Sequence, residues 1–172
     1  MILLPIKNNF DVFEIEMQKQ LIEILKNTFE YTIDYDEKIY PSVFKEFSVP
    51  EINRRSDIVV ALGNKLINVE CKLSNYASVL AQAKDHLSWA DYSYVCLHYK
   101  AFVPNYIMHD FIKNGIGVIY WTEKEFIEVL CGYSNTYKNG KKVKNIRDSV
   151  NKRIQILKSK ETGSNEKQLN II

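Results

Sequence analysis

The sequence has few of the residues that mark fibrous, disordered or membrane-spanning proteins. Only six glycines and four prolines occur in 172 residues, which excludes a collagen-like or low-complexity chain. No apolar run approaches the roughly 20 residues of a membrane-spanning helix, and residues 1–6 lack the features of a secretory signal. We therefore expect a globular cytoplasmic protein with no membrane partner.

Cysteine is also scarce. Cys71, Cys96 and Cys131 are odd in number and show no Cys-x-x-Cys spacing, and two of them interrupt apolar runs that are typical of strands. A chain of this length buries roughly two thirds of its unfolded surface, which suffices for a core without disulfides. The cysteines therefore indicate buried free thiols in a reducing compartment.

The net charge of +2 hides an uneven distribution. Residues 138–160 carry a net charge of +8, so the remainder of the chain carries −6. Such a segment favours contact with a polyanion, through residues that include Lys141, Lys142 and Lys144, although a plain solvated helix face is an equally good interpretation. An apolar stripe at helical spacing predicts that this segment docks on the rest of the protein; it comprises Val143, Ile146, Val150, Ile154 and Leu157.

Hydrophobic periodicity predicts a mixed α/β fold. We expect helices over residues 11–28, 77–90, 104–113 and 122–130, with Asp11 as the N-cap of the first and Thr122 and Glu125 as a capping box for the last. Strands are expected within residues 31–47, 57–62, 65–72, 92–99 and 116–121. This order predicts a mixed β-sheet flanked by helices over residues 1–135, a basic helical arm over 136–160 and a flexible tail over 161–172.

Gly63 and Asn64 separate two strand-like runs, which predicts a two-residue hairpin loop. Strand partners then have numbers that sum to 127, so Asp57 faces Glu70. Opposed side chains in a sheet lie about 4.5–5.5 Å apart, where two carboxylates repel each other unless a positive charge lies between them. A divalent cation would supply that charge.

Lys72 points to the same side of its strand as Glu70, two residues further along. An ordinary interpretation is that Lys72 only neutralises Glu70 on a solvated sheet face. Both acids are embedded in long apolar runs, however, and such runs are typical of strands covered on both sides, where an unpaired charge is costly. The pattern therefore favours a site at which Asp57, Glu70 and Lys72 converge.

The sequence resembles the motif of the PD-(D/E)XK nuclease superfamily, in particular that of its small bacterial and phage-type members. The resemblance lies in Asp57, which is followed after a gap of 12 residues by Glu70-Cys71-Lys72. The resemblance covers about residues 11–100. It implies a restriction-endonuclease-like αβββαβ core that binds Mg²⁺, with Mn²⁺ as a substitute, through Asp57, Glu70 and the backbone oxygen of Cys71. It further implies that Lys72 assists the attacking water. The sequence departs from the motif at Ser56, where proline is usual.

The resemblance also implies a helix glutamate in the metal shell. Glu14 lies about 40° from the centre of the apolar stripe of its predicted helix, so it is the first candidate and Glu16 the second. In the following helix, Gln82 is a candidate to orient the substrate phosphate or the catalytic water, and a purely structural amide is an equally good interpretation. In some branches the same glutamine is followed four residues later by tyrosine, whereas here His86 follows it.

Three further side chains are candidates for phosphate contact. Arg54 and Arg55 precede the strand of Asp57 and would clamp a phosphate, or would simply line a charged loop. His86 would contact phosphate or carry a proton, and a structural imidazole at a core boundary is the alternative.

These observations predict a Mg²⁺-dependent nuclease that hydrolyses phosphodiester bonds of DNA, with an endonuclease favoured over an exonuclease. A catalytically silent nucleic-acid-binding module on the same scaffold is the first alternative, and a protein-interaction domain is the second. A homodimer is a further expectation, because paired sites would allow both strands of a duplex to be cut.

Overall fold

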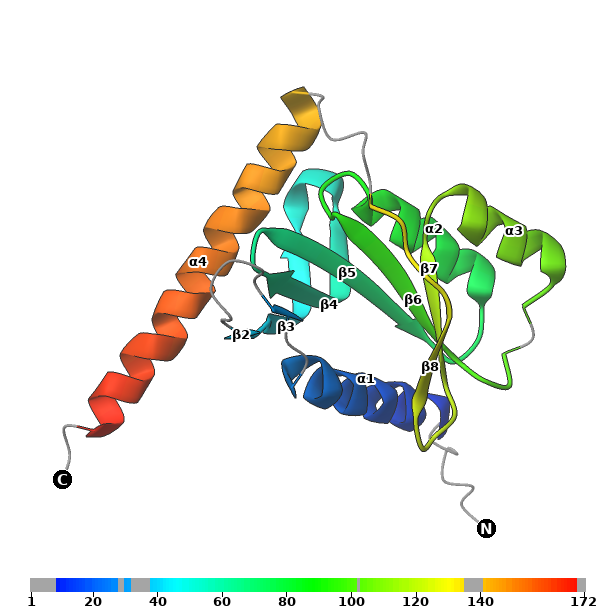
Figure 1. The fold of residues 1–172 in the computed structure, drawn as a ribbon, viewed down its shortest axis with the longest axis horizontal. Coiled ribbons are helices and arrows are strands. Elements are labelled where there is room, and N and C mark those ends of the chain that lie inside the picture. The colour runs from blue at the N-terminus through cyan, green and yellow to red at the C-terminus, as the bar shows by residue number, and fades with distance from the viewer. Residues whose placement is uncertain (1–8, 28–29, 32–37, 102, 135–140, 170–172) are drawn as a thin grey trace, which may run out of the picture.

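A six-stranded mixed sheet forms the centre of the computed structural model, which describes residues 9–27, 30–31, 38–101, 103–134 and 141–169 (Figure 1). Its strands follow the chain in the order β3(Ser42–Val49), β4(Arg54–Leu62), β5(Lys65–Lys72), β6(Tyr92–His98), β7(Gly117–Trp121) and β8(Phe126–Leu130). The inner pairs β5/β6 and β6/β7 are parallel, and the other three are antiparallel. A separate two-stranded ribbon joins β1(Glu30–Tyr31) to β2(Lys38–Ile39).

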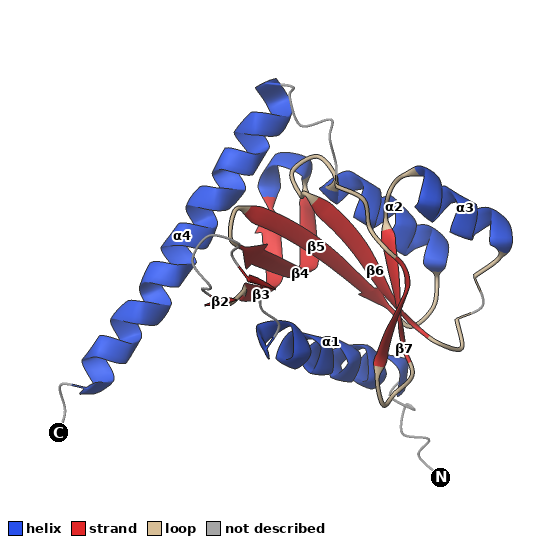
Figure 2. Ribbon diagram, in the orientation of Figure 1, coloured by secondary structure: helices blue, strands red, loops and turns tan. Residues whose placement is uncertain are grey.

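Four helices flank the sheet, which is the mixed α/β arrangement that the sequence predicts (Figure 2). Helix α1(Asn9–Asn27) covers one face through Met17 and Leu21, which pack on apolar side chains of β4 and β5. The opposite face is covered by α2(Tyr76–His86), α3(Asn105–Lys113) and α4(Lys141–Leu169). A short 3-10 turn, η1(Pro50–Ile52), joins β3 to β4. Both faces of β4 and β5 are therefore buried.

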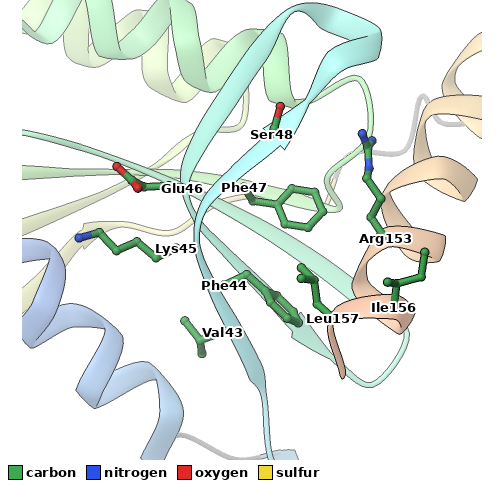
Figure 3. Close-up of a pocket in the computed structure, with 9 residues that line it drawn as sticks. All are labelled: Val43, Phe44, Lys45, Glu46, Phe47, Ser48, Arg153, Ile156 and Leu157. Atoms are coloured by element: carbon green, nitrogen blue, oxygen red, sulfur yellow. The ribbon is translucent and has the colours of Figure 1, made fainter. Parts of the chain in front are cut away.

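Helix α4 crosses the sheet edge at β3 and closes one part of the core. Ile146, Val150 and Ile154 are buried against Phe44 and Phe47 of β3, as the apolar stripe predicts. Figure 3 shows these two rings pointing from β3 toward α4, whereas Lys45 and Glu46 point away from it. A cavity of about 460 Å³ remains between β3 and the helix. The apolar stripe of the basic segment is therefore part of the core.

Two basic residues of α4 face the body of the protein. Arg147 donates to the carbonyls of Trp89 and Asn64, and its guanidinium lies 2.7 Å from Asp91. Arg153 forms a 2.7 Å ion pair with Glu51. These contacts place two positive charges against carboxylates, so the segment presents less charge to solvent than its sequence indicates.

The predicted helix over residues 122–130 is wrong, because Phe126–Leu130 forms strand β8. Thr122 does accept a hydrogen bond from the Glu125 N–H, but the Thr122 N–H also donates to the Glu125 carbonyl and so closes a hairpin turn. Glu123 occupies the left-handed region with φ 72 in that turn. The aromatic and β-branched residues that follow suit a strand better than a helix.

The termini of two helices also differ from the prediction. Helix α1 begins at Asn9, so Asp11 lies inside it and is not its N-cap. Helix α4 runs from Lys141 to Leu169, which moves the predicted boundary at residue 160 into the helix. A single internal glycine such as Gly163 costs only about 1 kcal/mol in a helix, which is too little to end it. Among the described residues no helix is both long enough and apolar enough to cross a membrane.

Candidate active site at the divergence of two strands

The hairpin between β4 and β5 has the predicted register. The paired residues extend from Leu62↔Lys65 at the turn to Ile58↔Val69, and the two residue numbers of each pair sum to 127. Gly63 has φ 56 in the turn, a left-handed conformation that glycine adopts at little cost. The ladder ends one step before Asp57, so the two predicted acids lie at the point where the strands separate.

Asp57 is the one residue of β4 that belongs to neither neighbouring ladder. On the other side of β4, the pairs with β3 also skip it, between Lys45↔Ile58 and Phe47↔Ser56. Glu46 lies opposite this interruption and has φ 51, which is uncommon for a residue with a side chain. The carboxylate Oδ2 of Asp57 accepts the Cys71 N–H at 2.8 Å and thus replaces the missing strand contact. Both ladders are therefore interrupted at Asp57, and its side chain contacts the backbone of β5 instead.

The side chain of Glu70 is fully buried. Neither of its carboxylate oxygens has a hydrogen-bond partner in the described part of the chain. Burial, followed by the nearby charge of Asp57, raises the pKa of Glu70 to about 8, although contacts with Asn68 and the Asp57 backbone and the charge of Lys72 oppose that shift. Burial also raises the pKa of Asp57, although its bond to the Cys71 N–H opposes that shift. Two adjacent acids that are costly to ionise require a cation or a proton to remain in place.

His86 lies beside Glu70 and is fully buried, so it does not reach the surface where we expected it to contact phosphate. Its Nε2 is 3.2 Å from Oε1 of Glu70, but the two are too poorly aligned for a hydrogen bond. The Trp89 indole donates to Nδ1 of His86 at 3.0 Å. Because an indole only donates, the proton of the neutral imidazole is on Nε2, facing Glu70. Burial lowers the pKa of His86 to about 4, which keeps the ring neutral.

Lys72 ends β5 and contacts α1. Its ammonium lies 2.9 Å from Oε1 of Glu14, and both side chains are about three-quarters buried. Burial alone would lower the pKa of Lys72, but Glu14 outweighs it and the pKa is raised. Lys72 is therefore an ammonium here. Glu16 is exposed and accepts a hydrogen bond from Gln20, so of the two helix glutamates Glu14 is the one near the site.

Gln82 lies one turn before His86 on α2. Its Oε1 is buried and has no hydrogen-bond partner among the described residues. Because α2 connects two parallel strands, it runs back against β5, so Gln82 lies nearer than His86 to the end of β5 that carries Lys72. The unpartnered amide oxygen is consistent with a ligand-facing role for this residue.

Sequence reasoning missed a buried polar network beneath the two acids. Ser56 Oγ lies 2.5 Å from Asn68 Oδ1, and Asn68 Nδ2 donates to Ser93 Oγ at 3.0 Å. Ser93 in turn donates to the carbonyl of Ala83 on α2. The network thus connects β4, β5, β6 and α2. Apolar or aromatic residues flank Asn68 and Ser93 in the sequence, which was the available signal, whereas Ser56 lies between Arg55 and Asp57 and gave none.

The candidate phosphate contacts have different surroundings. Arg54 is half-exposed and forms a 2.7 Å ion pair with Asp85 of α2, whereas Arg55 is more exposed and lies 3.9 Å from Glu46. Lys144 is exposed near the start of α4. Lys141 and Lys142 begin that helix, but their side chains lie outside the described part of the structure. Contact of these residues with nucleic acid stays a prediction.

The residues present fit a small hard cation only in part. The described His, Cys, Asp and Glu side chains contain no group of three arranged to hold a metal ion. The unpartnered oxygens of Glu70 and the adjacent Asp57 supply two carboxylates, however, and Mg²⁺ is commonly held by one or two carboxylates together with water and substrate phosphate. The donor set therefore fits Mg²⁺ bound jointly with a substrate.

Comparison with known proteins adds one structural neighbour. No family model matches the sequence, and no curated protein matches it. The structure of SfsA from Pyrococcus furiosus in complex with Ca²⁺ is similar, with a TM-score of 0.34 and 13% sequence identity, over 72% of this chain. The similarity spans 63% of that protein's chain. Membership of the PD-(D/E)XK superfamily therefore stays a prediction from the sequence motif.

Proposed function

We propose that this protein is a metal-dependent nuclease that hydrolyses phosphodiester bonds of DNA. The observation that carries the proposal is the buried carboxylate of Glu70, whose two oxygens lack hydrogen-bond partners among the described residues, beside Asp57 at the divergence of β4 and β5. Burial of two carboxyl groups without partners lowers the stability of the fold, which favours a functional role for both acids. A bound cation would stabilise the negative charge of the Asp57 and Glu70 carboxylates.

Asp57, Glu70 and the backbone oxygen of Cys71 would hold the Mg²⁺. When bound, Mg²⁺ supplies charge stabilisation at the phosphoryl oxygens and lowers the pKa of water. Lys72 is held as an ammonium by Glu14, so it stabilises developing negative charge and orients the attacking water, and it does not abstract a proton in this state. Gln82 would orient the water or a phosphate oxygen through its unpartnered amide.

A second candidate function is a catalytically silent nucleic-acid-binding module. The ion pair between Lys72 and Glu14 favours it, because this contact satisfies the lysine without any substrate. In that case the exposed lysines of α4, such as Lys144 and Lys152, would supply most of the binding energy.

A cleavage assay separates the two functions. Supercoiled plasmid, linear duplex, single-stranded DNA and RNA are incubated with the protein in Mg²⁺, Mn²⁺ or EDTA. We expect cleavage that requires metal and falls by at least about 100-fold in Glu70→Gln and in Lys72→Met. Glu16→Gln, an exposed acid on α1, is the matched control and should cleave normally. Equal activity in all four proteins, or binding without cleavage, would reject the enzyme.

A further inference from the structure

A second cavity opens beside the proposed active site. It has a volume of about 350 Å³ and lies where the parallel strands β5, β6 and β7 end. Leu73 and Ser74 line it directly after β5, His98 ends β6, and Glu123 follows β7. Crevices at the carboxyl ends of parallel strands are common ligand sites, since the loops there leave the sheet in different directions.

Two residues of the cavity lining are sequence neighbours of Lys72 and Glu14. Leu73 follows Lys72, and Phe13 of α1, which forms the opposite wall, precedes Glu14. Lys72 and Glu14 themselves lie 2.9 Å apart. A strand whose phosphate lies beside the partly exposed Lys72 would therefore place an adjacent nucleotide near this cavity.

Apolar and polar groups are separated within the lining. Phe13 is 45% exposed, and Leu73 and Ala101 extend the apolar surface. Polar groups come from the loops at the strand ends. A nucleobase has the same division, because its faces are apolar and its edge carries donors and acceptors.

The polar side of the cavity is pre-arranged. The Lys100 N–H donates to Nδ1 of His98 at 3.2 Å, so the proton of the neutral ring is on Nε2, which lies 2.8 Å from Oε1 of Glu123. Glu123 is held in a left-handed backbone conformation within its turn. One carboxylate of fixed orientation and the exposed ammonium of Lys100 thus face the cavity together with the Ser74 hydroxyl.

We propose that this cavity binds a single unpaired nucleobase of the substrate strand, next to a phosphate that Lys72 contacts, with Phe13 stacking on the base. The inference rests on the proposed nuclease function and adds the substrate class to it. A base in a duplex is stacked on both faces and paired along its edge, so it cannot also lie against Phe13. The protein therefore favours single-stranded or frayed DNA over a continuous duplex.

Binding measured in EDTA tests the cavity without cleavage. The probes are a fluorescein-labelled single-stranded oligonucleotide and the duplex of the same sequence, followed by fluorescence anisotropy. Phe13→Ala should raise the Kd for the single strand by at least about fivefold, because about 1 kcal/mol of base stacking corresponds to that change in Kd. The Kd for the duplex should change by less than about twofold. Phe13→Trp should restore binding. Ala101→Phe, which fills the cavity, is an independent second variant that should also weaken it.

Tyr106→Ala is the matched control, because Tyr106 is 67% exposed on α3 and lies outside the cavity lining. Thermal melting of each variant confirms that it is folded. Unchanged single-strand binding in both Phe13→Ala and Ala101→Phe overturns the inference, as do equal losses for single strand and duplex, or no measurable single-strand binding by the parent protein.

The cleavage assay keeps this inference distinguishable from the proposed function. Cleavage by the parent protein with unchanged binding in Phe13→Ala overturns the base site and leaves the nuclease in place. Phe13-dependent binding of single strands without any cleavage supports the base site and rejects the nuclease.

Discussion

The imidazole of His86 and the carboxyl group of Glu70 face each other across a distance of 3.2 Å, and both side chains are fully buried. Burial shifts their pKa values in opposite directions, to about 4 for His86 and about 8 for Glu70. Both groups are therefore neutral at pH 7, the histidine by lack of a proton and the glutamate by possession of one. The stability of the protein then depends on pH at both ends of the neutral range.

Glu70 should make the protein less stable as the pH rises above 6.5. Its pKa is raised in the folded state, so its stabilising contribution is full below the unfolded value near 4.5 and is lost as the pH approaches 8. We expect the free energy of unfolding to fall by up to about 1.4 kcal/mol per pH unit between pH 6.5 and 8 in EDTA. Urea denaturation at several pH values in this range measures that free energy.

Glu70→Gln removes this titration and should flatten that part of the stability curve, with a gain in stability at pH 8. The exposed Glu16→Gln variant is the control and should keep the slope of the parent protein. An unchanged slope in Glu70→Gln would show that the carboxyl group is not the titrating group.

His86 should act at the acid end. Its pKa is lowered in the folded state, so its contribution is present above about pH 6.5 and is lost as the pH falls toward 4. In the Glu70→Gln background, where the opposing titration is absent, unfolding should become easier as the pH falls through this window. The additional substitution His86→Gln should reduce the slope. Chemical denaturation at pH 4.5, 5.5 and 6.5 decides this prediction, and equal slopes in the two proteins contradict it.

Cation binding should release a proton. Because Glu70 holds a proton at pH 7, a bound Mg²⁺ must displace it from the carboxyl group. Calorimetric titration with MgCl₂ in two buffers of different ionisation enthalpy should give a release close to one proton per ion at pH 7, and little at pH 9. Asp57→Asn should weaken Mg²⁺ binding. Heat that does not depend on the buffer would argue against displacement at this site.

Glu14 should tune the charge of Lys72. Because Glu14 raises the pKa of Lys72, Glu14→Gln should shift the loss of cleavage activity at alkaline pH to a lower pH. The pH–rate profile from pH 7 to 11 is the measurement. Glu16→Gln on the same helix should leave the profile in place. A profile unchanged by Glu14→Gln would mean that the ammonium of Lys72 is not required for cleavage.

Helix α4 should be essential to stability. Ile154 is 2% exposed and packs with Phe44 and Phe47, so Ile154→Ala should cost about 2–5 kcal/mol of unfolding free energy. Ile156 is 53% exposed on the same helix, and Ile156→Ala should change the stability by less than about 0.5 kcal/mol. Thermal denaturation of both variants tests whether α4 belongs to the core. Similar melting temperatures for the two would contradict the packing described here.

The sequence allows accurate prediction where a local pattern has only one structural solution. Gly63 and Asn64 between two strand-like runs define a turn, and the register of the whole hairpin follows from that turn. The inward orientation of Glu14, whose carboxylate lies 2.9 Å from Lys72, could be predicted for the same reason, since a helix fixes the direction of each side chain relative to its apolar stripe. Both predictions depend on geometry within one element or one turn.

Prediction fails where two structures satisfy the same pattern or where a side chain competes with the backbone. Thr122 and Glu125 suit a helix cap and a hairpin turn equally well, and only pairing of β8 with β7 selects the turn. The carboxylate of Asp57 takes the Cys71 N–H from the ladder, which no periodicity shows. His86 looks like a boundary residue in a helical projection, yet contacts with Trp89 and Glu70 place it inside.

The packing of α4 on β3 also determines the order in which the polypeptide can complete its fold during synthesis. Phe44 and Phe47 leave the ribosome about a hundred residues before Ile146, which at about 5–20 residues per second corresponds to a delay of roughly 5–20 s. Throughout that interval the aromatic edge of the sheet is exposed to solvent. A shortened polypeptide that stops before Lys141 would keep Phe44 and Phe47 exposed permanently.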